Sequence, residues 1–523
     1  MNIAGSTMRH RELDFATAFA SFILPIGVRL VPEMLAFPYP IGFDTVAYYI
    51  PISLSKIALT TSITNYIGGT ILLYLLLTYA YILVGNAVVA MKLIPALVLG
   101  VFGWSVYLLG RRFLRWSSEW ALVLALTASL YFVTLRISWD LNRNIVGLTL
   151  VILTLAFLSD EKRIWKFIGI PTFASLALMV HEASAVLIGL ILIVHLVTNH
   201  NYRNREEWLR FLPVWILYGS QFALSRGLGA QIQPAATMPE YSTSFLYNVG
   251  FFLFAFGFLL PLAVVGLKMG LKRHMALWCI VALLLGLLPN FGLNTGSAYR
   301  WIFLLVVPIP ILFVQGMKVL TSIPRGWRRQ IGRTVIALSL VALIVVSTGY
   351  VGTHGLLRKY FDLAPSYEYL MPVSMVESTI AIPDMPDFST IVVWSNSTLT
   401  KAAILVLPFQ LYGLYLTTVS RIDPTKVKPL DQTMNLDEIM KSIQPLTGPN
   451  IAYARDVDLY VPEDEPRLVN LARESASNAG TSVYVVWWNP GQPNNAFNRL
   501  PSNFQPVFVS GRFAVYSMSS TWS

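Results

Sequence analysis

The residues of this chain that could do chemistry begin with one carboxylate in a loop rich in aromatic residues and proline. Asp44 lies in the stretch 37–49, FPYPIGFDTVAYY, the first polar segment after the first apolar run. Two prolines and a glycine oppose a continuous helix there, so we expect the loop to have a fixed shape of its own. Neighbouring rings, including Tyr48, would bury Asp44 in part and tune its proton affinity. Asp44 is therefore our candidate general base.

Other ionisable residues are expected at or near the outer ends of apolar helices. Charges at membrane depth are expensive and usually face a cavity or a partner. For any single Lys or Arg, snorkelling of the charged head to the surface is the alternative interpretation. Their concentration on one side favours a polar, cationic cavity that opens outward. These residues are Arg29, Glu33, Lys56, Lys92, Arg136, Asp140, Arg143, His181, Glu182 and Arg300.

Two short polar clusters interrupt the apolar runs on the same predicted side. The segment 138–144, SWDLNRN, carries Asp140, Arg143 and two amides, which suffice to cap helices or to hold an anionic ligand. The second cluster, His181-Glu182, lacks the spacing of a zinc hydrolase, because alanine occupies the place of the second histidine. A hydrogen-bonded structural pair is the equal alternative for it.

A third cluster, NFGLNTGSAYR, ends at Arg300. The guanidinium of Arg300 is suited to bidentate binding of a phosphate. It is equally suited to an ion pair with Asp140 or Glu182.

The composition is that of a membrane protein. Of 523 residues, 55% are hydrophobic and only 12% are charged, whereas a soluble domain is about 25% charged. The single cysteine, Cys279, excludes a disulfide framework. Twelve apolar runs approach the width of a bilayer. They are 15–34, 66–85, 87–109, 118–136, 142–158, 165–180, 183–198, 208–224, 245–267, 274–290, 299–317 and 333–351.

The distribution of Lys and Arg predicts the orientation. One set of loops holds nineteen of these residues and the opposite set five, so the crowded side is predicted to be cytoplasmic. Twelve full crossings would leave both chain ends on one side, yet the charges place them on opposite sides. We resolve this by predicting that 67–84 does not cross. The alternative is an ordinary hairpin in which Arg111, Arg112 and Arg115 break the charge rule.

The predicted fold is mostly α, with a polytopic transmembrane domain of about 11–12 helices followed by a small extracytoplasmic α/β domain. The membrane domain is 1–354, with its first external loop at 36–65, and the soluble domain is 355–523. The net charge is +11, and the tail contributes −3. The positive charges of the membrane part lie in short loops, where they are topology signals, so we do not predict a nucleic-acid partner.

Within the tail we expect strands at 390–394, 414–419 and 483–488, with the stretch 504–518 closing the sheet. Helices are expected at 398–410, 436–443 and 466–478. The expectations rest on β-branched runs, turn residues and possible helix caps.

The predicted chain has a cytoplasmic N-terminus and one helix, followed by an external loop with Gly-Phe-Asp44 and aromatic residues. Many helices and an external C-terminal domain come after this loop. This combination of features resembles the GT-C superfamily. The resemblance covers the whole architecture. It implies an integral-membrane glycosyltransferase that takes sugar from a polyprenyl-phosphate donor. An acidic residue in the first external loop of the family acts as catalytic base or helps to bind a metal. Only Asp44 matches, whereas several branches carry two acids there, so a divalent metal is possible and no cofactor is certain.

The resemblance also implies roles for the outer cations. Family members hold the lipid phosphate with Arg, Lys or His at outer helix ends, and Lys92, Arg143, Arg300 and His181 occupy such positions. Asp140, Glu182 and Tyr48 are candidates for support. The implied partners are the polyprenyl-phosphate sugar donor, a lipid, glycan or protein acceptor, and the bilayer of a plasma membrane.

One alternative function lies within the enzyme class and another lies outside it. Trp487-Trp488-Asn489-Pro490-Gly491 resembles the WWDYG signature of oligosaccharyltransferases but departs at two of five positions, and a strand followed by a turn is our preferred interpretation. A transporter or lipid flippase would also carry intramembrane charges. Against that function, the chain shows no internal repeat, and its charges lie at one end rather than at the midplane.

Overall fold

The structure is a computed structural model of the 523-residue chain. It describes residues 3–35, 45, 49–60, 63, 66, 72–158, 162, 164–227, 245–287, 299–322, 330, 334–335, 337–344, 385–408, 411–412, 415, 418–419, 448–454, 465–479, 481–488, 504–511 and 513–518.

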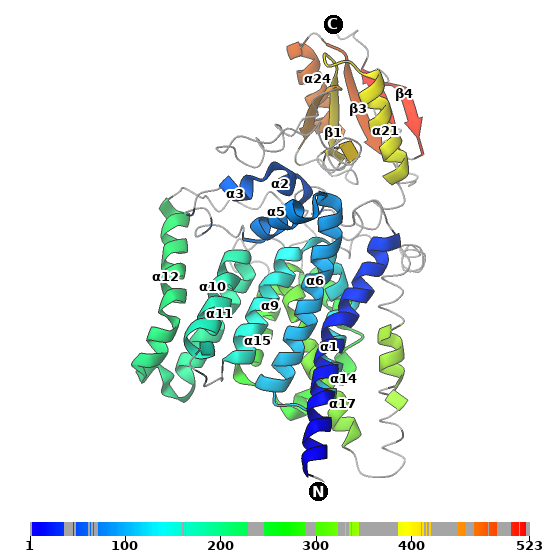
Figure 1. The fold of residues 1–523 in the computed structure, drawn as a ribbon. Helices are drawn as coiled ribbons and strands as arrows, with labels where there is room; N and C mark the ends of the chain where they lie inside the picture. Colours follow the sequence, from blue (N-terminus) through cyan, green and yellow to red (C-terminus); the bar gives the residue numbers. More distant parts are fainter. Residues whose placement is uncertain are drawn as a thin grey trace. The chain divides into compact units, whose positions relative to one another are not determined.

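Helices form in nearly every apolar run (Figure 1). Their bounds are α1 Ile3–Leu35, α2 Ile50–Ser55, α3 Ile57–Thr60, α5 Leu72–Val84, α6 Ala87–Leu108, η2 Leu109–Phe113, α7 Ser118–Leu130, α8 Phe132–Asp140, α9 Asn142–Phe157, η3 Trp165–Gly169, α10 Ile170–Val180, α11 Glu182–Val197, η4 Thr198–Arg203, α12 Arg205–Gly227, α13 Phe245–Phe256, α14 Leu260–Gly266, η6 Leu267–Met269, α15 Arg273–Leu287, α16 Tyr299–Phe303, η7 Leu304–Val306 and α17 Pro308–Thr321.

Three stretches of described helix are long and apolar enough to cross a membrane, namely Glu12–Val31, Ala87–Phe113 and Trp301–Thr321. Two bent pairs also qualify if each is one span: α7 with α8, bent by 58°, and α13 with α14, bent by 84°. Five further apolar helices are shorter, α5 among them. Helix α5 has 13 residues, or about 20 Å, less than the roughly 30 Å hydrocarbon core. The total of 11–12 crossings and the non-crossing role of 67–84 stay predictions.

Helices α1 and α6 pack closely because two glycines of α6 leave room for the α1 backbone. A side-chain carbon at Gly100 would collide with Ile26 and with the carbonyl oxygen of Phe22. One at Gly103 would collide with the carbonyl oxygen of Ser21. The contacts run in opposite order along the two helices, so the helices are antiparallel. Small residues that let backbones approach are typical of helix pairs in membranes.

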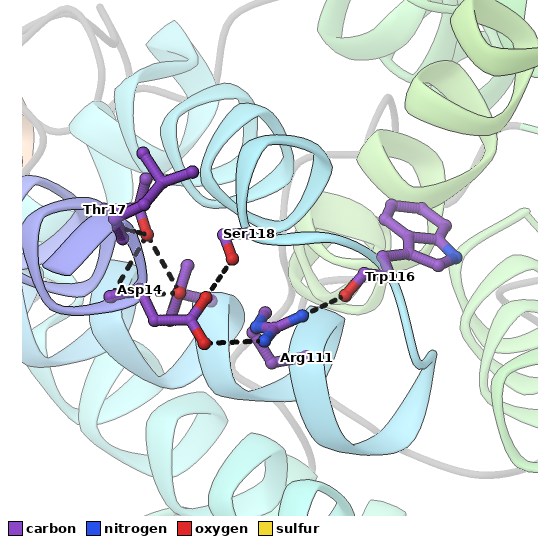
Figure 2. Close-up of polar contacts among 7 residues, drawn as sticks. Asp14, Thr17, Arg111, Trp116 and Ser118 are labelled. Atoms are coloured by element: carbon purple, nitrogen blue, oxygen red, sulfur yellow. Dashed lines mark hydrogen bonds and ion pairs between the residues drawn. The ribbon is translucent and has the colours of Figure 1, made fainter. Parts of the chain in front are cut away.

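Polar contacts fix the beginning of α1 to the turn that follows α6 (Figure 2). The Asp14 carboxylate accepts hydrogen bonds from Arg111 Nη2 at 2.9 Å and from Ser118 Oγ. Arg111 Nη1 also donates to the Trp116 carbonyl oxygen at 2.7 Å. Thr17 Oγ1 donates to the backbone oxygen of Asp14. These bonds join α1, η2 and α7 at one end of the helices, the end where α1 begins.

Helix α12 is joined to its neighbours by a buried ionic network. The Glu207 carboxylate accepts from Arg210 Nη1 at 3.0 Å and lies 3.1 Å from His195 Nε2 on α11. Arg210 Nη2 donates to the Leu158 carbonyl oxygen, at the end of α9, at 3.0 Å. The hydrogen bond with His195, followed by the charge of Arg210, lowers the pKa of Glu207 to about 2 against the opposing effect of burial. The network therefore ties three helices together through one ionised carboxylate.

Helices α14 and α17 are in backbone contact through a glycine on each. A side-chain carbon at Gly266 would collide with the Leu312 carbonyl oxygen, and one at Gly316 with that of Leu262. Because both collisions involve backbone atoms, neither helix can yield without moving as a whole. The pair therefore fixes the turn η6, which follows Gly266, against the last turns of α17.

The chain divides into two compact units, each built from several stretches of sequence. Their bounds are not those of the predicted domains, 1–354 and 355–523. The first comprises Met1–Pro32, Ser62–Leu73 and Leu93–Val373, and the second comprises Glu33–Thr61, Tyr74–Lys92 and Ser374–Ser523. The predicted boundary itself lies outside the described residues. Within the second unit, α5 lies beside α2, where the Tyr74 and Tyr49 rings are 6.1 Å apart (Figure 1).

The second unit contains a five-stranded mixed sheet in the order β2-β1-β3-β5-β4. The strands β1, β2 and β3 are parallel, and β5 and β4 extend the sheet antiparallel. The bounds are α21 Met385–Thr398, β1 Ile404–Pro408, β2 Asn450–Ala454, α24 Glu465–Ala479, β3 Val483–Trp488, β4 Phe504–Ser510 and β5 Phe513–Met518. Helix α21 packs on β4 and β5, and α24 packs on the parallel strands.

Several tail predictions are confirmed and three are wrong. The helix at 466–478 and the strands at 483–488 and 504–518 are present, whereas 436–443 lies outside the described residues. The strand predicted at 390–394 belongs to α21, because Phe388, Ile391, Val392 and Ser395 form one buried helical face. The helix predicted at 398–410 contains β1, whose apolar run is the buried centre of the sheet. The described residues of 414–419 are helical.

Candidate functional site

Lys92, one of the predicted outer cations, is paired with Glu33. The Lys92 ammonium donates to Glu33 Oε2 and to the Glu33 carbonyl oxygen, each at 3.0 Å. The two side chains are 8% and 3% exposed, so neither charge reaches bulk water. The pair holds the end of α1 against the beginning of α6, next in sequence to the loop of Asp44. Glu33 was predicted to be one of the outer charges, and its pairing with Lys92 was not predicted.

The clusters SWDLNRN and His181-Glu182 do come together, as their predicted common side requires. Arg143 Nη1, in the first turn of α9, lies 3.9 Å from Glu182 Oε1, and His181 Nε2 lies 3.8 Å from Glu182 Oε2. His181 has an extended backbone between α10 and α11. Because Glu182 is two-thirds exposed, this pair is weak and open to exchange with another anion.

Buried polar side chains surround this cluster. Ser184 Oγ and Asn144 Nδ2 are buried with no hydrogen-bond partner among the residues that the structure describes. A side-chain carbon at Gly147 would collide with Ser184, so the first turns of α9 and α11 are in close contact. Such unpartnered groups are costly in an apolar interior and were not predicted. For Asn144, the sequence signal was the run of polar residues at 138–144.

Two arginines lie deeper in the first unit. Arg29 on α1 is fully buried, and its Nη2 donates to the Ser138 carbonyl oxygen on α8 at 3.4 Å. Arg136, two residues before Ser138, is 2% exposed. Their positions inside apolar runs were noted in the sequence, but neither was assigned a role. Burial of a guanidinium in an apolar domain is expensive and usually marks a polar path or an anion site.

The structure describes the remaining predicted site residues only in part. Asp44 and Tyr48 lie outside the described residues. Their neighbours Thr45 and Tyr49 are buried. Asp140 is the last residue of α8 and Arg300 lies in α16, and these two helices contact each other. The orientation of the Asp140 and Arg300 side chains is outside the described structure, so their predicted ion pair stays a prediction.

In the described part of the chain, no three His, Cys, Asp or Glu side chains gather into a group that could hold a metal ion. The candidate residues whose side chains are described form two sets, each within its own unit. One is Lys92 with Glu33, and the other is Arg143, His181 and Glu182. Buried Arg29 and Arg136 lie in the same unit as the second set. The cations among these groups are suited to binding an anion.

Comparisons with known proteins agree at the level of the fold. No protein-family model and no curated protein matches the sequence. Arabinofuranosyltransferase AftD from Mycobacteria is 17% identical with a TM-score of 0.50, over 96% of this chain. This chain spans 41% of AftD. ArnT from Cupriavidus metallidurans, solved with undecaprenyl phosphate and in the apo state, is 14% identical over 99% of this chain with TM-scores of 0.47 and 0.49. The likeness to AftD is therefore one of fold.

Proposed function

We propose that this chain is a membrane glycosyltransferase that moves a sugar from a polyprenyl-phosphate donor to an acceptor on the extracytoplasmic face. The observation that carries the proposal is the burial of Arg29, Arg136 and Lys92 in helices of a chain with the AftD-like fold. Buried cations of this kind usually face a substrate path, where they can stabilise an anion that enters from the bilayer. The lipid-linked phosphate is such an anion.

In the proposed reaction, Asp44 removes the proton from an acceptor hydroxyl or amide as that group attacks the anomeric carbon. The bond between the anomeric carbon and the phosphate oxygen breaks, and the polyprenyl phosphate leaves with the electron pair. The product has the inverted configuration. General-base help of this kind contributes about 10²–10⁴-fold, and positioning with charge stabilisation contributes much of the remainder.

The outer cations stabilise the leaving phosphate in this scheme. Arg143 and His181 lie at helix ends beside a carboxylate that is open to water, so a phosphate can replace Glu182 at low cost. Lys92 donates two hydrogen bonds to Glu33. Binding of the phosphate by Lys92 therefore requires that the phosphate compete with Glu33 for the ammonium. Arg300 is the fourth assigned cation. Asp140 and Tyr48 remain in supporting roles.

The test is discharge of synthetic undecaprenyl-phosphate hexoses and pentoses by membranes that contain the chain. We expect one donor of the panel to release undecaprenyl phosphate. We expect Asp44→Asn to slow release about 10²–10⁴-fold, because the amide cannot take the proton. Glu119→Gln, which changes an exposed acid at the other end of the helices, should have no effect. Full activity of Asp44→Asn, or no discharge of any donor, contradicts the proposal.

A further inference from the structure

A basic surface with an aromatic floor lies at the end of the first unit where α1 begins, away from the candidate site. Lys272 Nζ is 4.3 Å from the centre of the Phe113 ring and also donates to the Phe113 carbonyl oxygen. Lys318 Nζ is 4.5 Å from the centre of the Trp116 ring. Arg115 lies between the two aromatic residues in sequence. We call Arg115, Lys272 and Lys318 the basic patch.

Two positive charges of the basic patch, those of Lys272 and Arg115, are close enough to repel each other. Burial, and after it the charge of Arg115, lowers the pKa of Lys272. Within the described residues no carboxylate pairs with any of the three cations. The nearby acid Asp14 is occupied by Arg111 and Ser118 (Figure 2). Like charges held together without a carboxylate favour binding of an external anion.

Arg115 has a backbone conformation that argues for a role of its charge. Its φ is +59°, in the left-handed region where glycine is the usual residue. The turn is closed by a hydrogen bond from the Trp116 amide to the Gly110 carbonyl oxygen at 2.9 Å. Glycine would form this turn with less strain, so the turn itself does not require an arginine.

The basic patch lies where three candidate membrane spans end. The span Ala87–Phe113 ends in the floor of the patch, the bent pair ends at Met269, and Trp301–Thr321 ends just after Lys318. The apolar side chains of Leu267 and Met269 are about half exposed beside Lys272. Cations and aromatic rings at the ends of apolar spans are suited to the lipid headgroup region.

We propose that Arg115, Lys272 and Lys318 form a binding site for the phosphate of an anionic membrane lipid. The two lysines and the arginine surround the phosphate, and the acyl chains continue along the apolar spans. A lipid phosphate, rather than a soluble one, is the occupant because the site lies at the boundary of those spans. Each cation contributes about a fivefold increase in affinity.

The experiment measures the thermal unfolding of the purified full chain in neutral detergent as phosphatidylglycerol, phosphatidylcholine or inorganic phosphate is added. We expect phosphatidylglycerol to raise the unfolding midpoint and phosphatidylcholine to leave it unchanged. Arg115→Gly should be at least as stable as the wild type without lipid, since it relieves the backbone strain. The same variant should bind phosphatidylglycerol about fivefold more weakly.

Lys272→Gln and Lys318→Gln should weaken phosphatidylglycerol binding similarly. Arg203→Gln is the matched control, because Arg203 is an exposed arginine over the ring of Tyr202, at 5.6 Å, in another turn. An equal response to the two lipids overturns the proposal, as does unchanged lipid binding by Arg115→Gly. Stabilisation by inorganic phosphate equal to that by phosphatidylglycerol overturns the assignment to a lipid.

Discussion

At the scale of residues, the structure separates charges that are paired in the interior from charges that are open to exchange. Lys92 and Glu33 are both buried and share two hydrogen bonds. Arg143 and Glu182 are nearly 4 Å apart and partly exposed. The first pair is rigid and costly to break, and the second is weak and replaceable. The two pairs therefore predict different outcomes for substitution.

Glu33→Gln should destabilise the chain by about 3–5 kcal/mol, because it removes the negative charge that accepts a hydrogen bond from the buried Lys92 ammonium. The double variant Glu33→Leu with Lys92→Met should recover most of that loss, since two apolar groups replace the pair. Thermal unfolding in detergent measures both effects. If the double variant unfolds as easily as Glu33→Gln, the loss does not come from an unpaired charge.

A prediction for the open pair concerns activity rather than stability. Arg143→Gln should change the free energy of unfolding by less than about 1 kcal/mol, as is usual for partly exposed ion pairs. If Arg143 holds the phosphate, the same variant should lose about 1.5–3 kcal/mol of donor binding, which is the value of a hydrogen bond to a charged group. The measurement compares the unfolding midpoint with the KM for the donor. An unchanged KM removes Arg143 from the phosphate site.

At the scale of elements, glycines decide which helices are in backbone contact. Gly316→Ala places a methyl group against the Leu262 carbonyl oxygen and should cost about 1–3 kcal/mol, since α14 and α17 must separate. Gly219→Ala on α12 is the matched control, because nothing lies within 4 Å of the added carbon. It should be neutral or stabilising by up to about 1 kcal/mol. Unfolding midpoints of the two variants test the contact, and equal midpoints would argue against it.

The network at the beginning of α12 predicts a dependence of stability on pH. The pKa of Glu207 is lowered to about 2 from its usual 4.5, so the unfolded chain binds a proton more readily than the folded chain. The stabilisation is therefore fully present above about pH 4.5 and is lost as the pH falls toward 2. The rate of unfolding in detergent should rise over that window and should vary less in Glu207→Gln. Equal pH profiles for the two proteins would exclude Glu207 as the cause.

At the scale of the whole molecule, the open question is the side of the membrane on which each part lies. The charge bias predicts that the sheet domain is extracytoplasmic and that the end of α17 is cytoplasmic. In a Cys279→Ala background, Ser477→Cys on α24 should react with a membrane-impermeant maleimide in intact cells. Ser322→Cys, exposed after α17, should react only after permeabilisation. The reverse pattern would invert the topology and place Asp44 in the cytoplasm.

The amino-acid sequence was sufficient to predict where most helices form and which loops carry the charges. It was sufficient because hydropathy and the clustering of Lys and Arg are properties of local composition. It also predicted that the clusters at 138–144 and 181–182 share one side. In the tail, local propensity failed at 390–394, because a β-branched run has its apolar residues at helical spacing and tertiary packing selects the helix.

Which distant charges meet could not be predicted, because it depends on how the helices pack. Glu33 and Lys92 are 59 residues apart, and their contact depends on the rotation and register of α1 against α6. Other contacts likewise join segments that are remote in sequence. They include the close approach at Gly147, the burial of Arg29 beside α8, and the contacts of Lys272 and Lys318 with the rings on either side of Arg115. Hydropathy predicts that a helix is buried. The rotation of the helix about its own axis is set by the side chains of the neighbouring helices.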